Sequence, residues 1–276
     1  MASPMVVVCT ALGIEYQAIR EHLAGPLRLC EVRGTVYETG RLAGARGSWQ
    51  VVLAQTGPGS TAAGVQLERA IGVFRPEAAL LLGVAGGRKD VARGDVVVAD
   101  TVYDYEWGKS AQEGYLPRMR TCFPAHRLLQ RAQLVAREDQ WQRRIPPGGP
   151  LRRPVSFVKP IATGAKVTAH RCSQVARLLD RYASDALAIE TEGHGFLQAA
   201  HANPGVDALV IRGISDLLTA KDTGSDYWQG AASRHAAAFA VELLDSLGSS
   251  PSSLSGRCPW ADHQLTAAVP PYRSSW

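Results

Sequence analysis

Three acidic side chains follow apolar segments of this chain, near the positions where buried strands should end. These acids are Glu15, Glu192 and Asp216, and each is preceded by a short run of apolar residues. In an α/β protein, the residue just beyond the carboxyl end of a buried strand lies at the rim of a cleft. Each acid alone could instead cap the helix that follows it. Three of them in one chain favour a shared cleft, in which carboxylates act as proton donor, proton acceptor or hydroxyl ligand.

Two glycine-rich segments lie between these acids. Thr56-Gly57-Pro58-Gly59 and residues 83–87 each follow an apolar strand pattern. Glycine permits close approach of a ligand to the backbone, and exposed N–H groups at such turns can hold an anion or a hydroxyl group. Neither segment has the Lys-Ser/Thr ending of a P-loop or the Gly-x-Gly-x-x-Gly pattern of a dinucleotide site. Tight turns explain both segments equally well.

The bulk composition is that of a globular protein. The chain has 276 residues, of which 46% are hydrophobic and 20% are charged. This length suits one large α/β domain or two small ones. No apolar run approaches the roughly 20 residues that span a bilayer. The start of the chain has no basic region before its first apolar run, so that run is interpreted as a strand and not as a signal peptide.

The charge and the cysteines argue against several classes of function. The net charge of +5 arises largely from arginines between residues 118 and 153, but this stretch contains no recognisable nucleic-acid motif. The five cysteines are scattered, and no histidine cluster has ligand spacing, which disfavours a zinc site or a disulfide framework. We expect reduced thiols, a cytoplasmic protein and no metal or organic cofactor.

The hydrophobic pattern predicts alternating strands and helices in one α/β domain over residues 1–248. The predicted strands cover residues 6–9, 27–32, 36–42, 49–54, 79–82, 95–99, 155–161, 187–190 and 209–214. The predicted helices cover residues 14–23, 61–74, 125–137, 173–180, 193–200 and 228–247.

Two segments differ from this pattern in their amino-acid composition. Residues 105–154 are rich in proline and arginine, and we predict an insertion or flap over the sheet, because the segment is too short and polar to bury a core of its own. Residues 249–276 are rich in serine and proline with little apolar periodicity, so we predict a disordered tail.

The order of the motifs is more specific than any single motif. The motifs are Thr10-Ala11-Leu12-Gly13-Ile14-Glu15, Thr56-Gly57-Pro58-Gly59, Gly83-Val84-Ala85-Gly86-Gly87, Ile189-Glu190-Thr191-Glu192 and Arg212-Gly213-Ile214-Ser215-Asp216. In this order they resemble the nucleoside phosphorylase superfamily, and within it methylthioadenosine/S-adenosylhomocysteine nucleosidases. The resemblance implies a three-layer domain with a central mixed, partly barrel-like sheet flanked by helices. It also implies a homo-oligomer, a dimer or larger, that cleaves an N-glycosidic bond.

The three acids suit that reaction. Cleavage of a ribosyl–purine bond places positive charge on the sugar and negative charge on the base. By resemblance, Asp216 is the proton donor to N7 of the base, with a pKa raised by partial burial and with Ser215 to orient it. Glu192 would hold the ribose hydroxyls and discriminate against deoxy sugars. Glu15 would polarise the attacking water, with Arg212 beside it.

The remaining predicted contacts follow the same motifs. Glu190 either supports the site or is purely structural. The other predicted substrate contacts are Thr191, Val84, Ala85, Gly86, Lys166 and Val167.

Water is favoured over phosphate as the nucleophile. Phosphorylases of this superfamily carry an arginine and a serine at positions that are Leu81 and Val84 here, and neither can bind phosphate through its side chain. Arg88 and Lys89 lie nearby and leave phosphorolysis as an alternative. The prediction is a purine nucleosidase that acts on an adenosine-type nucleoside and releases the free base.

Two departures bear on the substrate. Thr191 replaces the methionine that nucleosidases often carry, and the segment that ends at Lys166 and Val167 lacks the usual aromatic residue. The substrate could therefore be a larger or anionic adenosine derivative, with its anionic part near the arginine-rich insertion. A non-catalytic nucleoside-binding or sensing module is a further alternative.

Overall fold

The computed structural model describes residues 3–112, 114–148, 152–166, 170, 172–218 and 225–248. The predicted tail, residues 249–276, and the predicted base contact Val167 therefore lie outside the described residues. In this part of the chain, no helix is both long and apolar enough to cross a membrane.

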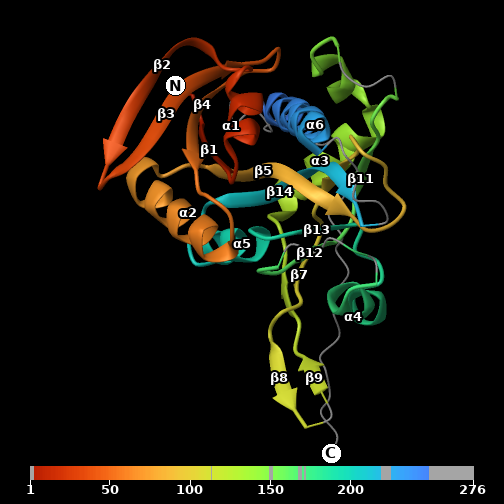
Figure 1. Ribbon diagram of the computed structural model, residues 1–276. Coiled ribbons are helices and arrows are strands. Elements are labelled where there is room, and N and C mark those ends of the chain that lie inside the picture. Colours follow the sequence, from red (N-terminus) through yellow and green to blue (C-terminus); the bar gives the residue numbers. More distant parts are fainter. Residues whose placement is uncertain are drawn as a thin grey trace, which may run out of the picture.

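The described residues form strands and helices that are mixed along the sequence, with runs of consecutive strands over residues 24–55 and 78–122 (Figure 1). The helices are α1 (Gly13–Arg20), α2 (Ser60–Phe74), α3 (His126–Glu138), α4 (Gln174–Tyr182), α5 (Gly193–His201), α6 (Ser225–Leu247) and the 3-10 helix η1 (Gln140–Arg144). The strands are β1 (Met5–Thr10), β2 (Ala24–Val32), β3 (Thr35–Ala43), β4 (Ser48–Gln55), β5 (Ala78–Gly87), β6 (Val96–Val98), β7 (Val102–Asp104), β8 (Gly108–Ala111), β9 (Gly114–Pro117), β10 (Arg120–Cys122), β11 (Ser156–Val158), β12 (Ile161–Thr163), β13 (Ala188–Glu190) and β14 (Asp207–Leu217).

The central sheet is mixed and forks at β5. On one edge, β5 pairs with β1 and then with β13, and on the other edge it pairs with β14. One branch continues through β12, β7 and β10, and another continues from β14 through β6 to β11. Strand β3 pairs antiparallel with both β2 and β4. The mixed central sheet flanked by helices confirms the predicted fold class.

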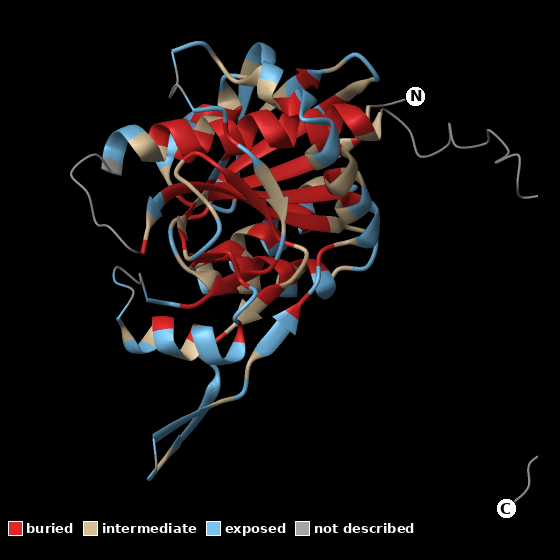
Figure 2. Cartoon of the chain, turned by 90° about the vertical axis from the view of Figure 1, so that its right-hand side faces the viewer, coloured by how far each residue is buried: buried red, intermediate tan, exposed pale blue. Residues whose placement is uncertain are grey.

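Helices cover both faces of the sheet. Along β1, Val6 and Val8 face a core built with α1, α3 and α6, whereas Val7 and Cys9 face a core built with α2 and α5. This alternation is expected of a strand that is buried on both sides. Figure 2 shows the buried strands between the two helical layers.

Residues 105–154, predicted to be an insertion or flap, contain two different structures. Strands β8 and β9 form an exposed hairpin that projects from the body of the molecule (Figures 1 and 2). Helix α3 and η1 instead pack against α6, where Trp141 is buried and its ring lies 5.7 Å from that of Phe239. Several arginines of the stretch form ion pairs within the chain, such as Arg144 with Glu242 and Asp245.

Three predicted boundaries are wrong. The predicted strand 155–161 is two strands, β11 and β12, because the chain crosses between branches of the sheet at Pro160, which has no N–H to donate. Residues 83–87, predicted to be a loop, continue β5. Ser215 and Asp216, predicted to follow a strand, lie inside β14. Glycine lowers strand propensity, which hid the extension of β5.

Candidate active site

Strands β1 and β13 approach each other end to end along one edge of β5. Strand β1 runs parallel to β5 and pairs with it as far as Leu81, whereas β13 runs antiparallel and pairs with Gly87 and Gly86. The carboxyl ends of β1 and β13 therefore face each other beside the middle of β5. Such a change in strand direction leaves side chains and backbone N–H groups free for a ligand.

Glu15 enters this gap from the first turn of α1. Its Oε2 accepts hydrogen bonds from the N–H groups of Ala11 (2.9 Å) and Leu12 (2.8 Å), and its Oε1 accepts one from the N–H of Val84 (2.8 Å). Glu15 thus caps its own helix and also lies in the gap, so both interpretations of the sequence apply to it. Burial raises the pKa of Glu15, against the opposing effects of Arg212 and of the Leu12 and Val84 N–H groups.

Glu190 and Glu192 enter the gap from the end of β13, and Arg212 joins them. Nη2 of Arg212 donates to Oε2 of Glu190 and to Oε2 of Glu192, the latter at 2.9 Å. Glu190 also accepts the N–H groups of Glu192 (2.9 Å) and Gly193 at the start of α5. All three charged side chains are buried. Glu190 therefore fixes both the backbone of Glu192 and the position of Arg212.

Glu192 has partners on both of its oxygens. Besides Arg212, it accepts hydrogen bonds at Oε1 from the N–H of Gly59 (2.8 Å) and from the hydroxyl of Thr191. Burial alone would raise the pKa of Glu192, but Arg212, Thr191 and Gly59 together lower it below its ordinary value. Glu192 is therefore ionised at neutral pH.

Arg212 reaches the acids by passing over a glycine. It lies opposite Gly83 in the β5–β14 ladder, and a Cβ at Gly83 would lie 2.3 Å from Nη1 of Arg212 and 2.5 Å from Oε1 of Glu15. Arg212 is fully buried, and its Nε and Nη1 have no hydrogen-bond partner among the described residues. Burial opposes its charge, but Glu190, Glu192 and Glu15 raise its pKa. We call Glu15, Glu190, Glu192 and Arg212 the carboxylate cluster.

Asp216 lies at the other end of the same cavity. The β5–β14 register shifts between Ile214 and Asp216, and this bulge places Ser215 and Asp216 both against the cavity. Asp216 lies opposite Gly86, where an added Cβ would be 2.9 Å from Oδ1 of Asp216. The partial burial predicted for Asp216 is not found: Ser215 is buried, but Asp216 is exposed at the rim of the cavity, near the end of β14.

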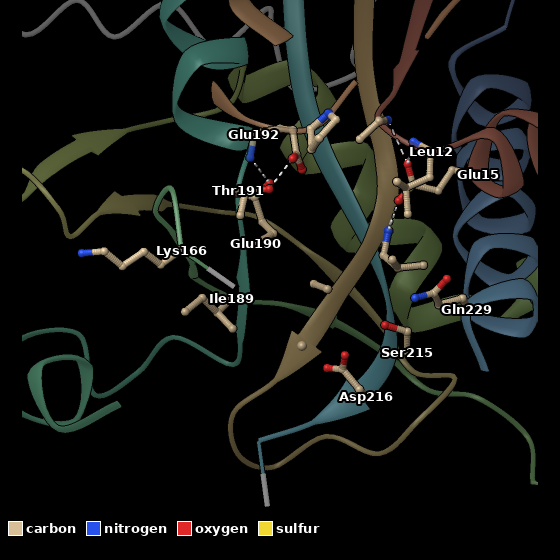
Figure 3. A pocket seen from close by; sticks show the side chains of 15 residues that line it. Leu12, Glu15, Lys166, Ile189, Glu190, Thr191, Glu192, Ser215, Asp216 and Gln229 are labelled. Atoms are coloured by element: carbon tan, nitrogen blue, oxygen red, sulfur yellow. Dashed lines mark hydrogen bonds between the residues drawn. The ribbon is translucent and has the colours of Figure 1, made fainter. Parts of the chain in front are cut away.

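One cavity is lined by side chains from both ends of the site (Figure 3). Its volume is about 240 Å³. It is lined by the predicted residues Glu15, Glu190, Glu192, Thr191, Val84, Ala85, Gly86, Lys166, Ser215 and Asp216. Arg212 lies behind the lining, in contact with the acids. In Figure 3 the side chain of Lys166 points away from the carboxylate cluster, and its Nζ lies 3.4 Å from Oε1 of Glu106.

Five lining residues were not predicted from the sequence, namely Ala11, Leu12, Pro58, Ile189 and Gln229. The first four lie inside the quoted motifs and could have been included on that ground. Gln229 comes from α6, and no local signal connects this helix to the strand ends. Within the described part of the chain, no group of His, Cys, Asp and Glu side chains is arranged to hold a metal ion.

Arg88 and Lys89, whose positive charges left phosphorolysis as an alternative, do not line the cavity. Arg88 donates to the carbonyl of Ala183 (3.1 Å) and forms an ion pair with Asp180 of α4 (2.6 Å). Lys89 lies 4.0 Å from its neighbour Asp90. The carboxylate cluster itself has three acids and one guanidinium group, so its formal charge is negative.

Comparison with known proteins agrees with this geometry. Residues 3–247 match the model of the phosphorylase superfamily. The chain is 28% identical to a 5′-methylthioadenosine/S-adenosylhomocysteine nucleosidase of Aeromonas salmonicida (strain A449), over 88% of this chain and 99% of the relative.

Solved structures share the fold. An S-adenosylhomocysteine nucleosidase of Streptococcus pyogenes superposes with a TM-score of 0.72 at 22% identity, over 90% of this chain and 98% of the other. The futalosine hydrolase of Helicobacter pylori strain 26695 superposes with a TM-score of 0.71 at 21% identity, over 88% and 98% of the two chains. The resemblance predicted from the motif order is confirmed: the chain belongs to the phosphorylase superfamily.

Proposed function

We propose that the protein is an N-glycosyl hydrolase that releases the free base from an adenosine-type purine nucleoside. The relatives described above are nucleosidases and a hydrolase by name, which supports hydrolysis within this family. In the proposed reaction, a water oxygen forms a bond to C1′ of the sugar while the bond between C1′ and N9 of the base breaks. The water proton passes to Glu15, and the base receives a proton at N7 from Asp216.

The negative charge of the carboxylate cluster is the observation that carries this proposal. Glu15, Glu190 and Glu192 face one guanidinium group, so the cluster favours the positive charge that develops on the sugar. The described contacts leave one lone pair of Glu15 Oε1 for a water molecule. The raised pKa of Glu15 makes it a better base than an ordinary exposed carboxylate.

The same charge disfavours phosphate as the nucleophile. A phosphate anion in the gap would be repelled by three carboxylates. Leu81 is buried in the core, and the N–H of Val84 is used by Glu15. Arg88 is held against α4 by carbonyl and carboxylate groups. The Val84 N–H and the Arg88 guanidinium group thus have other partners.

The direct test is incubation with adenosine, 5′-methylthioadenosine and futalosine, each with and without inorganic phosphate, followed by chromatography of the products. We expect free base and free sugar without phosphate. Strict dependence on phosphate, with a sugar phosphate as product, would contradict hydrolysis and support the phosphorylase alternative.

The exposure of Asp216 favours a second candidate, a nucleoside-binding or sensing module without catalysis. A proton donor to the leaving base works best when it is shielded from water, and Asp216 is exposed. Calorimetric binding of a nucleoside together with no base release over a long incubation would support this candidate.

We further propose that the protein is a cytoplasmic homo-oligomer. A second cavity of about 750 Å³ shares Pro58 with the first, and the exposed side chains of Trp107 and Val65 line it. Exposed apolar side chains around a cavity are typical of an interaction surface. Four cysteines in the described residues are free thiols, which fits a reducing compartment. Analytical ultracentrifugation tests the oligomeric state, and a purely monomeric protein at micromolar concentration would contradict it.

A further inference from the structure

The contacts of Glu192 limit what it can offer a sugar. An ionised carboxylate has about four lone-pair positions. Oε1 already accepts the hydroxyl of Thr191 and the N–H of Gly59, and Oε2 accepts Nη2 of Arg212. Among the described contacts, one position remains, and it is on Oε2. Glu192 can therefore accept a hydrogen bond from one sugar hydroxyl and not from two. The sequence had instead predicted that Glu192 holds the ribose hydroxyls by itself.

Thr191 supplies the second acceptor. Its side chain lines the cavity, and its hydroxyl group donates a hydrogen bond to Oε1 of Glu192 (Figure 3). A hydroxyl group that donates to one partner keeps its oxygen lone pairs for another donor. The oxygen of Thr191 can thus accept the hydroxyl that Glu192 cannot.

We propose that Thr191 is a specificity-determining residue that divides the recognition of the two ring hydroxyls of the sugar between itself and Glu192. One hydroxyl donates to the charged Oε2 of Glu192, and the other donates to the neutral oxygen of Thr191. This inference rests on the proposed function, because it concerns the sugar of the same nucleoside.

Because the two ring hydroxyls bind different acceptors, they should contribute unequally to the affinity for the sugar. A hydrogen bond to a charged group contributes roughly tenfold to a hundredfold in binding, whereas one between neutral groups contributes roughly twofold to tenfold. Loss of the hydroxyl that binds Glu192 therefore weakens recognition strongly. Loss of the hydroxyl that binds Thr191 weakens it only modestly, because the bond between Thr191 and Glu192 remains.

The Thr191→Val substitution isolates this effect. Valine keeps the shape of threonine but frees a lone pair on Oε1 of Glu192, so the second hydroxyl now meets a charged acceptor. The test is to measure kcat/KM for adenosine, 2′-deoxyadenosine and 3′-deoxyadenosine with the wild type, Thr191→Val and Thr191→Ser. The quantity compared is the change in each adenosine-to-deoxyadenosine ratio on substitution, because this cancels the greater intrinsic lability of 2′-deoxy glycosides.

We expect Thr191→Val to raise one of the two ratios by about tenfold and to change the other by less than about twofold. Thr191→Ser, which keeps the hydroxyl, is expected to leave both ratios as in the wild type. Thr191→Ala should reproduce the effect of valine, and it replaces that variant if the valine protein has a lowered melting temperature.

Two results would overturn the inference while leaving the hydrolase intact. These are base release with neither ratio changed by Thr191→Val, and base release with both ratios changed equally. If the wild type releases no base from any nucleoside, the proposed function fails first. The same three ligands are then compared by calorimetric affinity, and the same pattern of ratios decides the inference for a binding module. Absence of any nucleoside binding would remove both proposals.

Discussion

The two ends of the cavity are built in opposite ways, although both use residues of β14 that lie opposite glycines of β5. In the carboxylate cluster, Arg212 crosses Gly83 and is buried among partners. At the other end, Asp216 lies opposite Gly86 and is exposed. Residues 83–87 are therefore strand and not a loop, and the N–H of Val84 binds the carboxylate of Glu15. Gly83 and Gly86 lack the Cβ atoms that would obstruct two side chains of the candidate site, one in the interior and one at the rim.

The difference predicts where stability and activity are coupled. In the carboxylate cluster Glu190 and Glu192 share one buried guanidinium group, so the loss of one of these three charges affects folding as well as chemistry. At the exposed end a change of side chain meets solvent and affects mainly the reaction. Substitutions at the two ends should separate these outcomes.

The largest effect is expected from Arg212→Met. Methionine fills much of the same volume but leaves Glu190 and Glu192 without their common cation. We expect the free energy of unfolding to fall by about 3–5 kcal/mol, together with loss of activity. Urea unfolding measures the first quantity, and Arg177→Met on the exposed face of α4 is the control. A stable Arg212→Met protein would show that the cluster is less tightly coupled than its contacts indicate.

Asp216→Asn should separate activity from stability. An asparagine keeps the shape of the side chain but has no carboxyl proton for the leaving base. We expect kcat/KM to fall by about 10²–10⁴. The free energy of unfolding should change by about 1 kcal/mol or less, because the side chain is exposed. An unchanged rate would rule out Asp216 as the proton donor.

A matched pair of glycine substitutions tests the structural basis of the comparison. In Gly83→Ala the new Cβ meets Arg212 and Glu15, both buried, whereas in Gly86→Ala it meets the end of the exposed Asp216 side chain. Neither glycine has a positive φ, so the comparison concerns space and not backbone strain. We expect Gly83→Ala to lower the free energy of unfolding by about 1–3 kcal/mol.

Gly86→Ala should be less harmful to folding, because Asp216 can turn into solvent. It should still lower kcat/KM, since that rotation moves the proposed proton donor away from the cavity. Thermal unfolding and initial rates of base release measure the two effects. Equal destabilisation by both substitutions would contradict the distinction between a rigid and an open end.

The sequence predicted which residues line this site better than it predicted how the strands bring them together. Apolar runs that end near Glu15 and Glu192 located the strands, because a buried strand needs continuous apolar residues. The same pattern could not reveal that β1 and β13 meet end to end, since register and strand direction depend on contacts far apart in the sequence. It also placed Asp216 after a strand, because no local signal marks the bulge in β14.

The pH dependence should distinguish two carboxylates inside the cluster. Burial raises the pKa of Glu15 from its ordinary value of 4.5, whereas Arg212, Thr191 and Gly59 overcome burial and lower that of Glu192. As the pH falls from neutrality, Glu15 is therefore protonated first, and a protonated Glu15 cannot accept the proton of water. We expect kcat/KM to decrease on the acid side at a pH above 4.5.

As the pH falls, the stability of the fold should depend on the protonation of Glu192 and not on that of Glu15. A carboxyl group with a raised folded pKa binds its proton more readily in the folded state, so protonation of Glu15 does not destabilise the fold. The contribution of Glu192, whose folded pKa is lowered, is present above its unfolded pKa and is lost only as the pH falls through the lower folded value. Activity should consequently disappear reversibly while the circular dichroism spectrum is still that of the folded protein. An acid limb that coincides with unfolding would mean that the cluster titrates as one unit and that Glu15 has no separate role as a base.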